Sequence, residues 1–550
     1  MSIQCGNEPE DDRLIRRQLD DQLSKEEFCA FNARLKNDPA FRVRYVKLSH
    51  MESQLYEHCG TALQAKPVHV SGRNWPLMTI IVLSACIALL LILQAQNVRL
   101  NRADHDTAET IPDEPLLYKP DRFDAPSVAV VVSVSGDVHP SLRTGQRIGP
   151  GILEFDTGVV HLEFFNGARV AIEGPANLRV ESSQKATLLF GRVATYVPPR
   201  ARGFVLNAPG AAIVDLGTEF EINVNDHSVT EVAVSNGEIE LSMLGDDGNT
   251  LVSQRLVESG AVRLNGLNGE VQNISFDKSH TALQARYLPE PPLHVSLQYV
   301  NDVISLGPEI YWRFEQQDAL TVLNEIDGGV QATVTNKSEP ESLVIRDGNI
   351  RFRRDQRRSR YVLTDRPIDG LGRGPMTLEL WMRPDDLQHS TCLGLIHDDP
   401  DPGRNHLSVL EVATDTFLVH EPGAIRFLVR SPPAHDFALG VNAFTPGLVT
   451  PGQWQHVVAV WDTGKIQLYF NGMAAGHVEV EQENCEGRFH VILGQLRMST
   501  NTHRPFSGAL DEVALYRRAL TSDDVQRHFE LIRTQNPDTT QQTTLPGDGQ

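Results

Sequence analysis

Carboxylates and histidines are the side chains of this sequence that could carry out acid–base chemistry. Glu379 and the pair Asp511 and Glu512 stand on predicted strands, and hydrolysis of a glycosidic bond uses two carboxylates that flank the bond. No alternating trio of acids surrounds them, so we interpret them as edge or turn carboxylates. The sequence also lacks a nucleophile elbow, a phosphate loop and a dinucleotide fingerprint, which predicts a binding protein and no enzyme. The scattered histidines show no metal-ligand spacing and are interpreted as solvated or packed residues: His389, His397, His406, His420, His435 and His456.

A run of arginines, RFRRDQRRSR, concentrates positive charge within an acidic chain. Guanidinium groups could hold an anionic glycan or a lipid headgroup by bidentate contacts. A charged edge strand that blocks aggregation is an equally good interpretation. The candidate anion-binding residues are Arg351, Arg353, Arg354, Arg357 and Arg358.

The acidic loop HDDPDPGRNH offers carboxylate oxygens of the kind that calcium prefers. Asp398, Asp399 and Asp401 are the candidate calcium ligands, and a solvated loop without metal is the alternative. Cys392 and Cys485 could form one disulfide if their Cα atoms lie within about 7 Å. None of the six cysteines forms a CxxC pair, so the sequence predicts no structural zinc site.

Length and charge limit the class of protein. A chain of 550 residues predicts about three or four domains, and its 40% hydrophobic and 22% charged residues are typical of globular chains. The net charge of −21 argues against direct binding of nucleic acid.

One uncharged segment, WPLMTIIVLSACIALLLILQA at residues 75–95, predicts a transmembrane helix. At about 1.5 Å per residue it would cross a hydrocarbon core of about 30 Å. The flanking basic residues do not decide its orientation. The acidic remainder of the chain favours a cytoplasmic N-terminus and an extracytoplasmic body, because long domains translocate largely regardless of charge.

The segment before it, residues 1–74, has the periodicity of short amphipathic helices. Leucines recur at three- to four-residue spacing, and Ser24 with Glu27 predicts a capping box. The apolar stripe either packs on itself as a helical hairpin or is completed by a partner.

Beyond residue 125 the pattern changes to strands. Alternating residues flank Asn166-Gly167, the strongest short hairpin signal, and Asn236-Gly237 joins a second pair of predicted strands. The segments TGVVHLEFFNGARVAIEGPANLRVES, GRVATYVP, FVLNAPGAAIVDLGTEFEINV and TEVAVSNGEIEL resemble, in order and spacing, the extracytoplasmic domain of FecR-type sigma regulators. This resemblance covers about residues 126–265.

The N-terminal segment LIRRQLDDQLSKEEFCAFNARLKNDPAFRVRYVKLSHMESQL is similar to the cytoplasmic anti-sigma domains of that family. The resemblance implies a head that clamps an extracytoplasmic-function sigma factor. The segment departs from the zinc-containing members of the family, because His50, His58 and Cys59 have no second thiol nearby. The implied sigma-factor contacts are Leu19, Leu23, Phe28, Phe31, Leu35, Phe41 and Tyr45.

The last 250 residues hold four of the five tryptophans and many short alternating strands, which predict a sandwich or jelly roll. The segments YWRFE, PMTLELWMRP, QWQHVVAVWDTGKIQLYFNGMAAG and FSGALDEVALYRRALTSDDVQRHFE resemble the laminin-G-like, concanavalin A-like jelly roll. The resemblance implies a fold, and it says little about the ligand.

The predicted fold class is multidomain: a small all-α head and one transmembrane helix, followed by two all-β domains. We expect the head at 1–74, the transmembrane helix at 75–95, a proline-rich acidic linker at 96–125, the FecR-like domain at 126–275, a second linker at 276–304, the jelly roll at 305–533 and a disordered tail at 534–550.

These patterns together predict a single-pass regulator of the bacterial inner membrane. It would bind and inhibit a sigma factor on the cytoplasmic side and sense a glycan or envelope protein on the outer side, with no certain cofactor. The alternative is a membrane-anchored carbohydrate-binding adhesion or scaffold protein without sigma regulation. An exported lectin-like hydrolase is a third interpretation.

Overall fold

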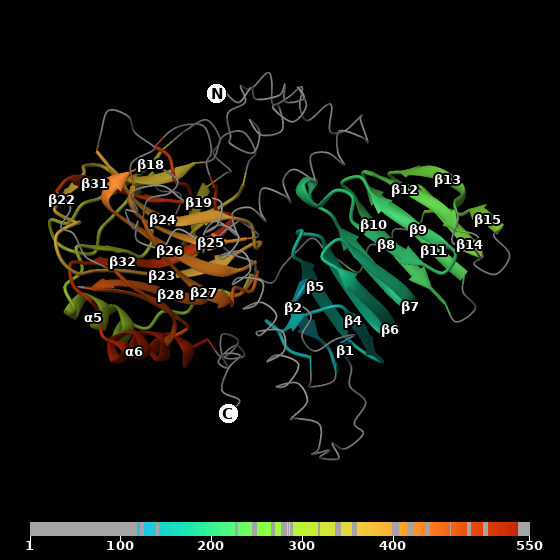
Figure 1. Cartoon of the computed structure of the whole chain (residues 1–550), viewed down its shortest axis with the longest axis horizontal. Helices are drawn as coiled ribbons and strands as arrows, with labels where there is room; N and C mark the ends of the chain where they lie inside the picture. The colour runs from blue at the N-terminus through green and yellow to red at the C-terminus, as the bar shows by residue number, and fades with distance from the viewer. Residues whose placement is uncertain are drawn as a thin grey trace, which may run out of the picture. The chain divides into compact units, whose positions relative to one another are not determined.

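The computed structural model describes two β domains (Figure 1). Both belong to one compact unit, residues 116–550. The predicted head, the segment 75–95 and every predicted sigma-factor contact lie outside the described residues. The described residues are 118–120, 126–138, 142–225, 229–244, 250–265, 270–276, 283, 285, 290–316, 320–335, 343–354, 360–398, 406–414, 422–434, 440–462, 464–480, 486–498 and 504–536.

The N-terminal β domain, drawn from cyan to green in Figure 1, is one largely antiparallel sheet curved around its own core. Alternate residues of each strand point inward, and 35 buried apolar side chains form the core. Its elements are β1 (Tyr118–Pro120), β2 (Ala129–Ser135), β3 (Arg147–Ile148), β4 (Gly151–Phe155), β5 (Val159–Phe164), β6 (Arg169–Ser182), β7 (Lys185–Tyr196), η1 (Pro199–Ala201), β8 (Val205–Ala208), β9 (Ala211–Asp215), β10 (Glu219–Val224), β11 (Val229–Asn236), β12 (Glu238–Leu244), β13 (Thr250–Val257), β14 (Ala261–Asn265) and β15 (Glu270–Asn273).

The two Asn-Gly signals of this domain have different outcomes. The hairpin at Asn166-Gly167 is confirmed, because β5 and β6 pair directly on either side of it. The prediction of a hairpin at Asn236-Gly237 is wrong, because β11 pairs with β10 and β14, whereas β12 pairs with β9 and β13. Gly237 has φ of +86°, which lets the chain turn from one part of the sheet to another. Local turn chemistry is thus satisfied there, but each strand finds its partners elsewhere in the sheet.

The C-terminal β domain, drawn from yellow to red, is a sandwich of two antiparallel sheets, as predicted for the jelly roll. The large apolar core lies between the sheets. The first sheet contains β16 (Ile310–Trp312), β19 (Leu343–Arg346), β20 (Asn349–Phe352), β23 (Met376–Pro384), β28 (Gln455–Asp462), β29 (Lys465–Phe470), β30 (Met473–Glu479) and β32 (Gly508–Tyr516). The second contains β17 (Thr321–Val322), β18 (Ala332–Thr335), β21 (Tyr361–Thr364), β22 (Ile368–Asp369), β24 (Ser390–His397), β25 (His406–Ala413), β26 (Ala424–Ala434), β27 (Val441–Gly447) and β31 (Arg488–Leu493).

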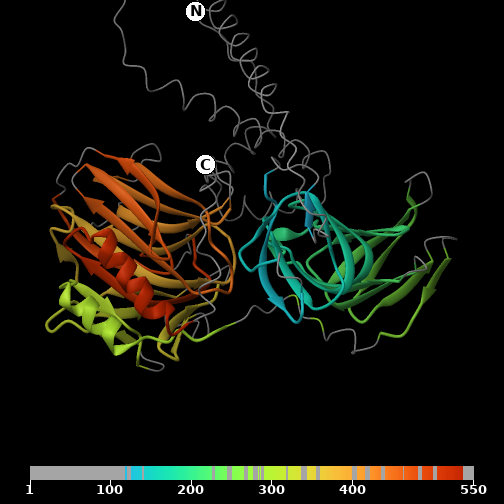
Figure 2. The ribbon, with the colours of Figure 1, turned by 90° about the horizontal axis from the view of Figure 1, so that it is seen from below.

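Helices α5 (Leu297–Ser305) and α6 (Ser522–Arg533) lie side by side on this domain (Figure 2). Their apolar faces pack on the first sheet, on the side away from the sandwich core. The Ser296 hydroxyl caps α5 by accepting from the Tyr299 N–H at 3.1 Å. A capping box of Thr521 and Asp524 begins α6. The segment predicted as the second linker therefore ends in a packed helix.

The predicted fold class is wrong in its helical and membrane parts. The described residues are mostly strand, and α5 and α6 are the α-helices among them. These helices are about 14 and 18 Å long at 1.5 Å per residue, too short for a bilayer core of about 30 Å. Within the described part of the chain there is no small all-α domain and no helix long and apolar enough to cross a membrane.

Candidate functional site at the domain junction

Strand β2 contributes buried side chains to two hydrophobic cores. Ala129 and Val131 pack in the core of the N-terminal domain, whereas Val130 and Val132 pack in the cluster formed mainly by the C-terminal domain. Side chains alternate between the two faces of a strand, so a run of consecutive apolar residues can be buried on both faces. All four are fully or nearly fully buried. The run AVVV thus marks the apolar part of the junction between the domains.

The β5–β6 hairpin supplies the charged part of the junction. Glu163 and Arg169 face each other across the two strands, and the Arg169 Nε donates to Glu163 at 3.0 Å. Glu163 also accepts from the backbone N–H of Leu387 at 3.3 Å, and Arg169 donates to the Asp385 carbonyl. Both partners belong to the turn after β23. Burial raises the pKa of Glu163, although Arg169 and then Arg200 oppose that shift.

Asp386 connects arginines of both domains. It accepts from Arg200 Nη1, on η1 of the N-terminal domain, at 3.0 Å. It also accepts from Arg354 Nη1 at 3.0 Å, and Arg354 in turn donates to the Pro505 carbonyl. Burial opposes ionisation of Asp386, but the charges of Arg354 and Arg200 outweigh it and hold its pKa below the usual range. The carboxylate is therefore charged at neutral pH.

The predicted arginine run borders a cavity of about 420 Å³ at this junction. Arg351 is paired with Asp385 at 3.1 Å and with Glu290 at 2.7 Å. Arg353 is exposed and, among the described residues, has no hydrogen-bond or ion-pair partner. Arg357 and Arg358 lie outside the described residues. The structure thus brings Arg351, Arg353 and Arg354 to one cavity.

The junction residues were missed at the sequence level, although one signal was available. Glu163 and Arg169 are each three residues from Asn166, so a hairpin whose three-residue loop is centred on Asn166 places their opposite charges directly across from each other. No comparable local pattern links Arg200 to Asp386, because the two are 186 residues apart.

The predicted calcium and disulfide residues are only partly described. Asp398 accepts from Arg488 Nη2 at 2.5 Å, while Asp399 and Asp401 lie outside the described residues. No cluster of metal-binding side chains is found in the described part of the chain. Cys392 is a free, buried thiol, and burial raises its pKa. Cys485 lies outside the described residues.

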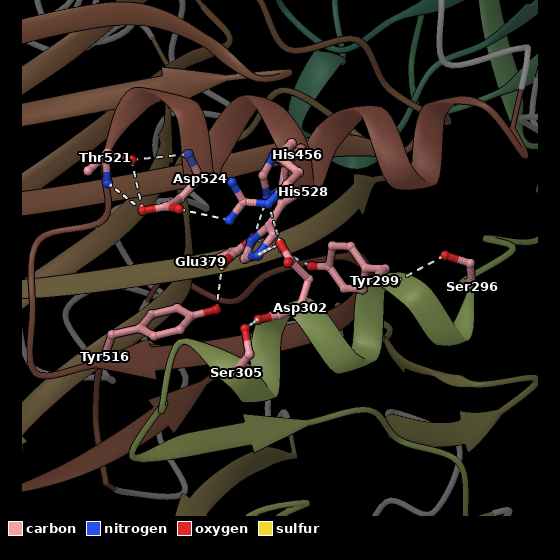
Figure 3. Close-up of polar contacts among 11 residues, drawn as sticks. Ser296, Tyr299, Asp302, Ser305, Glu379, His456, Tyr516, Thr521, Asp524 and His528 are labelled. Atoms are coloured by element: carbon pink, nitrogen blue, oxygen red, sulfur yellow. Dashed lines mark hydrogen bonds and ion pairs between the residues drawn. The ribbon is translucent and has the colours of Figure 1, made fainter.

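The carboxylates interpreted as edge or turn residues are in fact buried within strands. Glu379 lies on β23, and its Oε1 accepts from His456 Nε2 and His528 Nδ1, each at 2.8 Å (Figure 3). Tyr516 donates to Oε2 at 2.8 Å, and Tyr299 donates to Oε1 at 3.4 Å. Glu379 is turned toward the helices because its neighbours on β23 point into the sandwich core. Its carboxylate holds α5 and α6 onto the sheet.

Charge within this cluster is balanced. Burial opposes ionisation of Glu379, but His528 and His456 outweigh it and lower the pKa of Glu379. Burial also opposes a charge on His528, yet Glu379 and then Asp302, 3.2 Å away, raise the pKa of His528. Burial lowers the pKa of His456. A buried anion therefore pairs with cationic His528 while neutral His456 donates a hydrogen bond.

The pair Asp511 and Glu512 is likewise buried, at 3% and 1% exposure. Glu512 accepts from Arg313 Nε at 3.1 Å and from the Tyr311 hydroxyl. Burial raises the pKa of Glu512 to about 7. Neither this pair nor Glu379 can reach a glycosidic bond in this conformation, because none of them is exposed to solvent.

A polar cluster also lies on the second sheet, on the face away from the sandwich core. Glu411 of β25 accepts from Thr391, Arg426 and Arg504 at 2.9–3.0 Å, and His389 Nε2 lies 3.0 Å away. Its pKa is lowered because His389, Arg504 and Arg426 outweigh the cost of burial. The Glu411 side chain is fully buried, whereas those of His389 and Arg504 are 19% and 21% exposed. These two side chains lie at the partly exposed edge of the cluster.

Comparison with solved structures finds distant resemblances. A Ruminococcus gnavus IT-sialidase CBM40 domain bound to α2,3-sialyllactose is 18% identical, with 28% of this chain and 81% of that chain covered and a TM-score of 0.24. A native heptameric SAP-like pentraxin from Limulus polyphemus is 16% identical, with 30% and 73% covered and a TM-score of 0.24. Resemblances at this level say nothing about ligands. No curated protein matches the chain.

Two family models match separate parts of the chain. Residues 155–240 match the FecR protein family, and residues 355–526 match the concanavalin A-like lectin/glucanases superfamily. The first match contains Glu163, Arg169 and Arg200, and the second contains Asp385 and Asp386. The chain therefore joins a FecR domain to a concanavalin A-like domain, and the charged junction lies between them.

Proposed function

We propose that this protein is a FecR-type regulator that inhibits an extracytoplasmic-function sigma factor and responds to a carbohydrate bound by its concanavalin A-like domain. The observation that carries the proposal is the presence of both matched domains in one chain. The FecR match supports anti-sigma regulation, and the lectin-like match supports carbohydrate binding. The bacterial inner membrane, where FecR proteins typically act, is the location that the proposal assigns.

The junction supports the idea that the two domains act together. Buried valines of β2 and the ion pair between Arg200 and Asp386 connect the FecR domain to the concanavalin A-like domain. A ligand that binds one arrangement of the domains better than another would shift the equilibrium between them. About 1.4 kcal/mol of coupling is enough for a tenfold change in affinity for a sigma factor.

The carbohydrate would be bound and not cleaved. Glu379, Asp511 and Glu512 are buried, so none of them can serve as an acid or nucleophile toward an external glycan in this conformation.

Co-purification of the full-length chain with its partner tests the proposal. The native chain, cross-linked in the bacterium that encodes it, is expected to retain one sigma factor identified by mass spectrometry. A chain carrying Phe28→Asp and Leu35→Asp at two implied contacts is the matched control and should lose it. If the native chain retains a glycan but no sigma factor, the adhesion or scaffold function replaces the regulatory one.

A further inference from the structure

We infer that the cavity at the domain junction binds an acidic saccharide, one that carries a carboxylate or sulfate group, and that this ligand bridges the two domains. This ligand class and this binding place rest on the proposed function.

The charge of the cavity favours an anionic ligand. Five arginines and three carboxylates line it, and Glu163, outside the lining, pairs with Arg169, which leaves one positive charge in excess within a chain whose net charge is −21. Such a cavity attracts anions, whereas the acidic chain as a whole repels them. The five arginines are Arg169, Arg200, Arg351, Arg353 and Arg354.

The arginines of the cavity are preorganised to bind a ligand. Arg354 and Arg200 are already held in place by Asp386, so their guanidinium planes are ordered before a ligand arrives. The Arg351 Nη1 atom is buried and has no hydrogen-bond partner within the described residues. Arg353 also lines the cavity, is exposed and has no partner among those residues. Ordered guanidinium groups and a buried donor without a partner therefore meet in one cavity, and guanidinium groups suit paired carboxylate or sulfate oxygens.

The size and lining of the cavity favour a saccharide over a bare ion. Its volume of about 420 Å³ lies within the range of small-molecule sites. Tyr196, Pro198 and Pro199 add apolar side chains to the lining, and the Arg169 guanidinium lies 6.0 Å from the centre of the Tyr196 ring. A sugar ring can pack its C–H groups on such side chains while its acidic group pairs with arginine.

The geometry also predicts what the ligand does. Arg169 and Arg200 belong to the FecR domain. Arg351 lies on β20 of the C-terminal sandwich, and Arg353 and Arg354 follow that strand directly. An anion held by both sets adds attractive contacts that exist only when the domains are docked. Binding therefore stabilises the docked arrangement.

Calorimetric titration of the purified full-length chain with a uronic acid disaccharide tests the inference. The neutral disaccharide of the same sugars and inorganic sulfate are the comparison ligands. We expect the acidic disaccharide to bind and to raise the unfolding temperature, and Arg353→Ala to weaken binding at least tenfold. Arg346→Ala, which changes an exposed arginine of β19 outside the cavity lining, is the matched control and should leave binding unchanged.

Equal binding of the neutral disaccharide, equal binding of sulfate, or an unchanged affinity in Arg353→Ala would each overturn the inference. Because Arg353 is exposed and unpaired in the described structure, its loss should not unfold the chain, and circular dichroism checks this. Retention of a sigma factor by a chain that does not bind the acidic disaccharide would reject this site alone. Loss of sigma-factor retention in the native chain would reject the proposed function.

Discussion

Arg200 and Asp386 form an ion pair of 3.0 Å although 186 residues separate them in the chain. One belongs to the FecR domain and the other to the concanavalin A-like domain. Since Asp386 also binds Arg354, a single carboxylate orders arginines on both sides of the junction. Any change in how the two domains dock must therefore alter the distance between Arg200 and Asp386.

Replacement of Asp386 by Asn should destabilise the junction. It removes a charge that two arginines neutralise, and hydrogen bonds to charged groups contribute about 1.5–3 kcal/mol. We expect the free energy of unfolding to fall by about 1–3 kcal/mol in chemical denaturation at pH 7. The folded pKa of Asp386 is lowered, so its contribution is fully present above the unfolded value near 3.9 and is lost as pH falls from that value through the folded pKa. The variant and the native chain should therefore converge in stability at acidic pH, and a constant difference would contradict the assigned ion pairs.

Replacement of His528 by Gln should change the pH dependence of stability. The folded pKa of His528 is raised by Glu379 and Asp302, so its contribution is fully present below the unfolded value near 6.5. That contribution is lost as pH rises through the folded pKa. Unfolding temperatures measured from pH 5 to pH 9 should show the native chain losing its advantage over the variant toward high pH. His456→Gln is the control. Because the pKa of His456 is lowered, the advantage of the native chain over this variant should shrink toward low pH instead. Parallel pH profiles for all three proteins would show that these histidines do not titrate as described.

Replacement of Thr521 by Ala should weaken the start of α6. The Thr521 hydroxyl accepts from the Asp524 N–H at 3.2 Å, and the Asp524 carboxylate accepts from the Thr521 N–H at 3.1 Å. Loss of an N-cap hydroxyl costs about 1 kcal/mol. The unfolding temperature should drop by a few degrees, while Thr521→Ser should retain most of the stability. Equal losses in both variants would mean that the methyl group, and not the cap, matters.

Replacement of Val132 by Asp should separate the two β domains. Val132 is 1% exposed and packs in the cluster of the C-terminal domain, where an unpaired carboxylate is strongly unfavourable. Limited proteolysis should cut the variant between the domains faster than the native chain. Val134→Asp is a control on the same strand at a partly buried position and should have a smaller effect. Identical cleavage rates in the native and Val132→Asp chains would contradict a packed junction.

Much of the β architecture could be predicted from sequence, because alternation and turn residues are local signals. The hairpin at Asn166-Gly167 forms, as predicted, and a second Asn-Gly pair, Asn471-Gly472, joins the paired strands β29 and β30. The hairpin at Asn236-Gly237 does not form, since strand pairing depends on distant partners that a dipeptide does not specify.

The polar clusters were harder to predict. Glu379 alternates with core residues of β23, which on sequence alone is also the pattern of a solvent-facing carboxylate. Its partners His456 and His528 come from β28 and α6, 77 and 149 residues away. The predicted arginine run does reach a cavity, but the FecR-domain arginines that complete the cavity could be found only from the docked structure.

Genome-wide transcript measurement in the encoding bacterium, with and without the gene for this chain, tests the central claim most directly. Deletion should raise one set of transcripts whose promoters share a single recognition sequence, and the native chain should restore their level. The Phe28→Asp, Leu35→Asp chain should fail to restore it. If deletion changes no such set, the chain does not regulate a sigma factor and the proposed function is wrong.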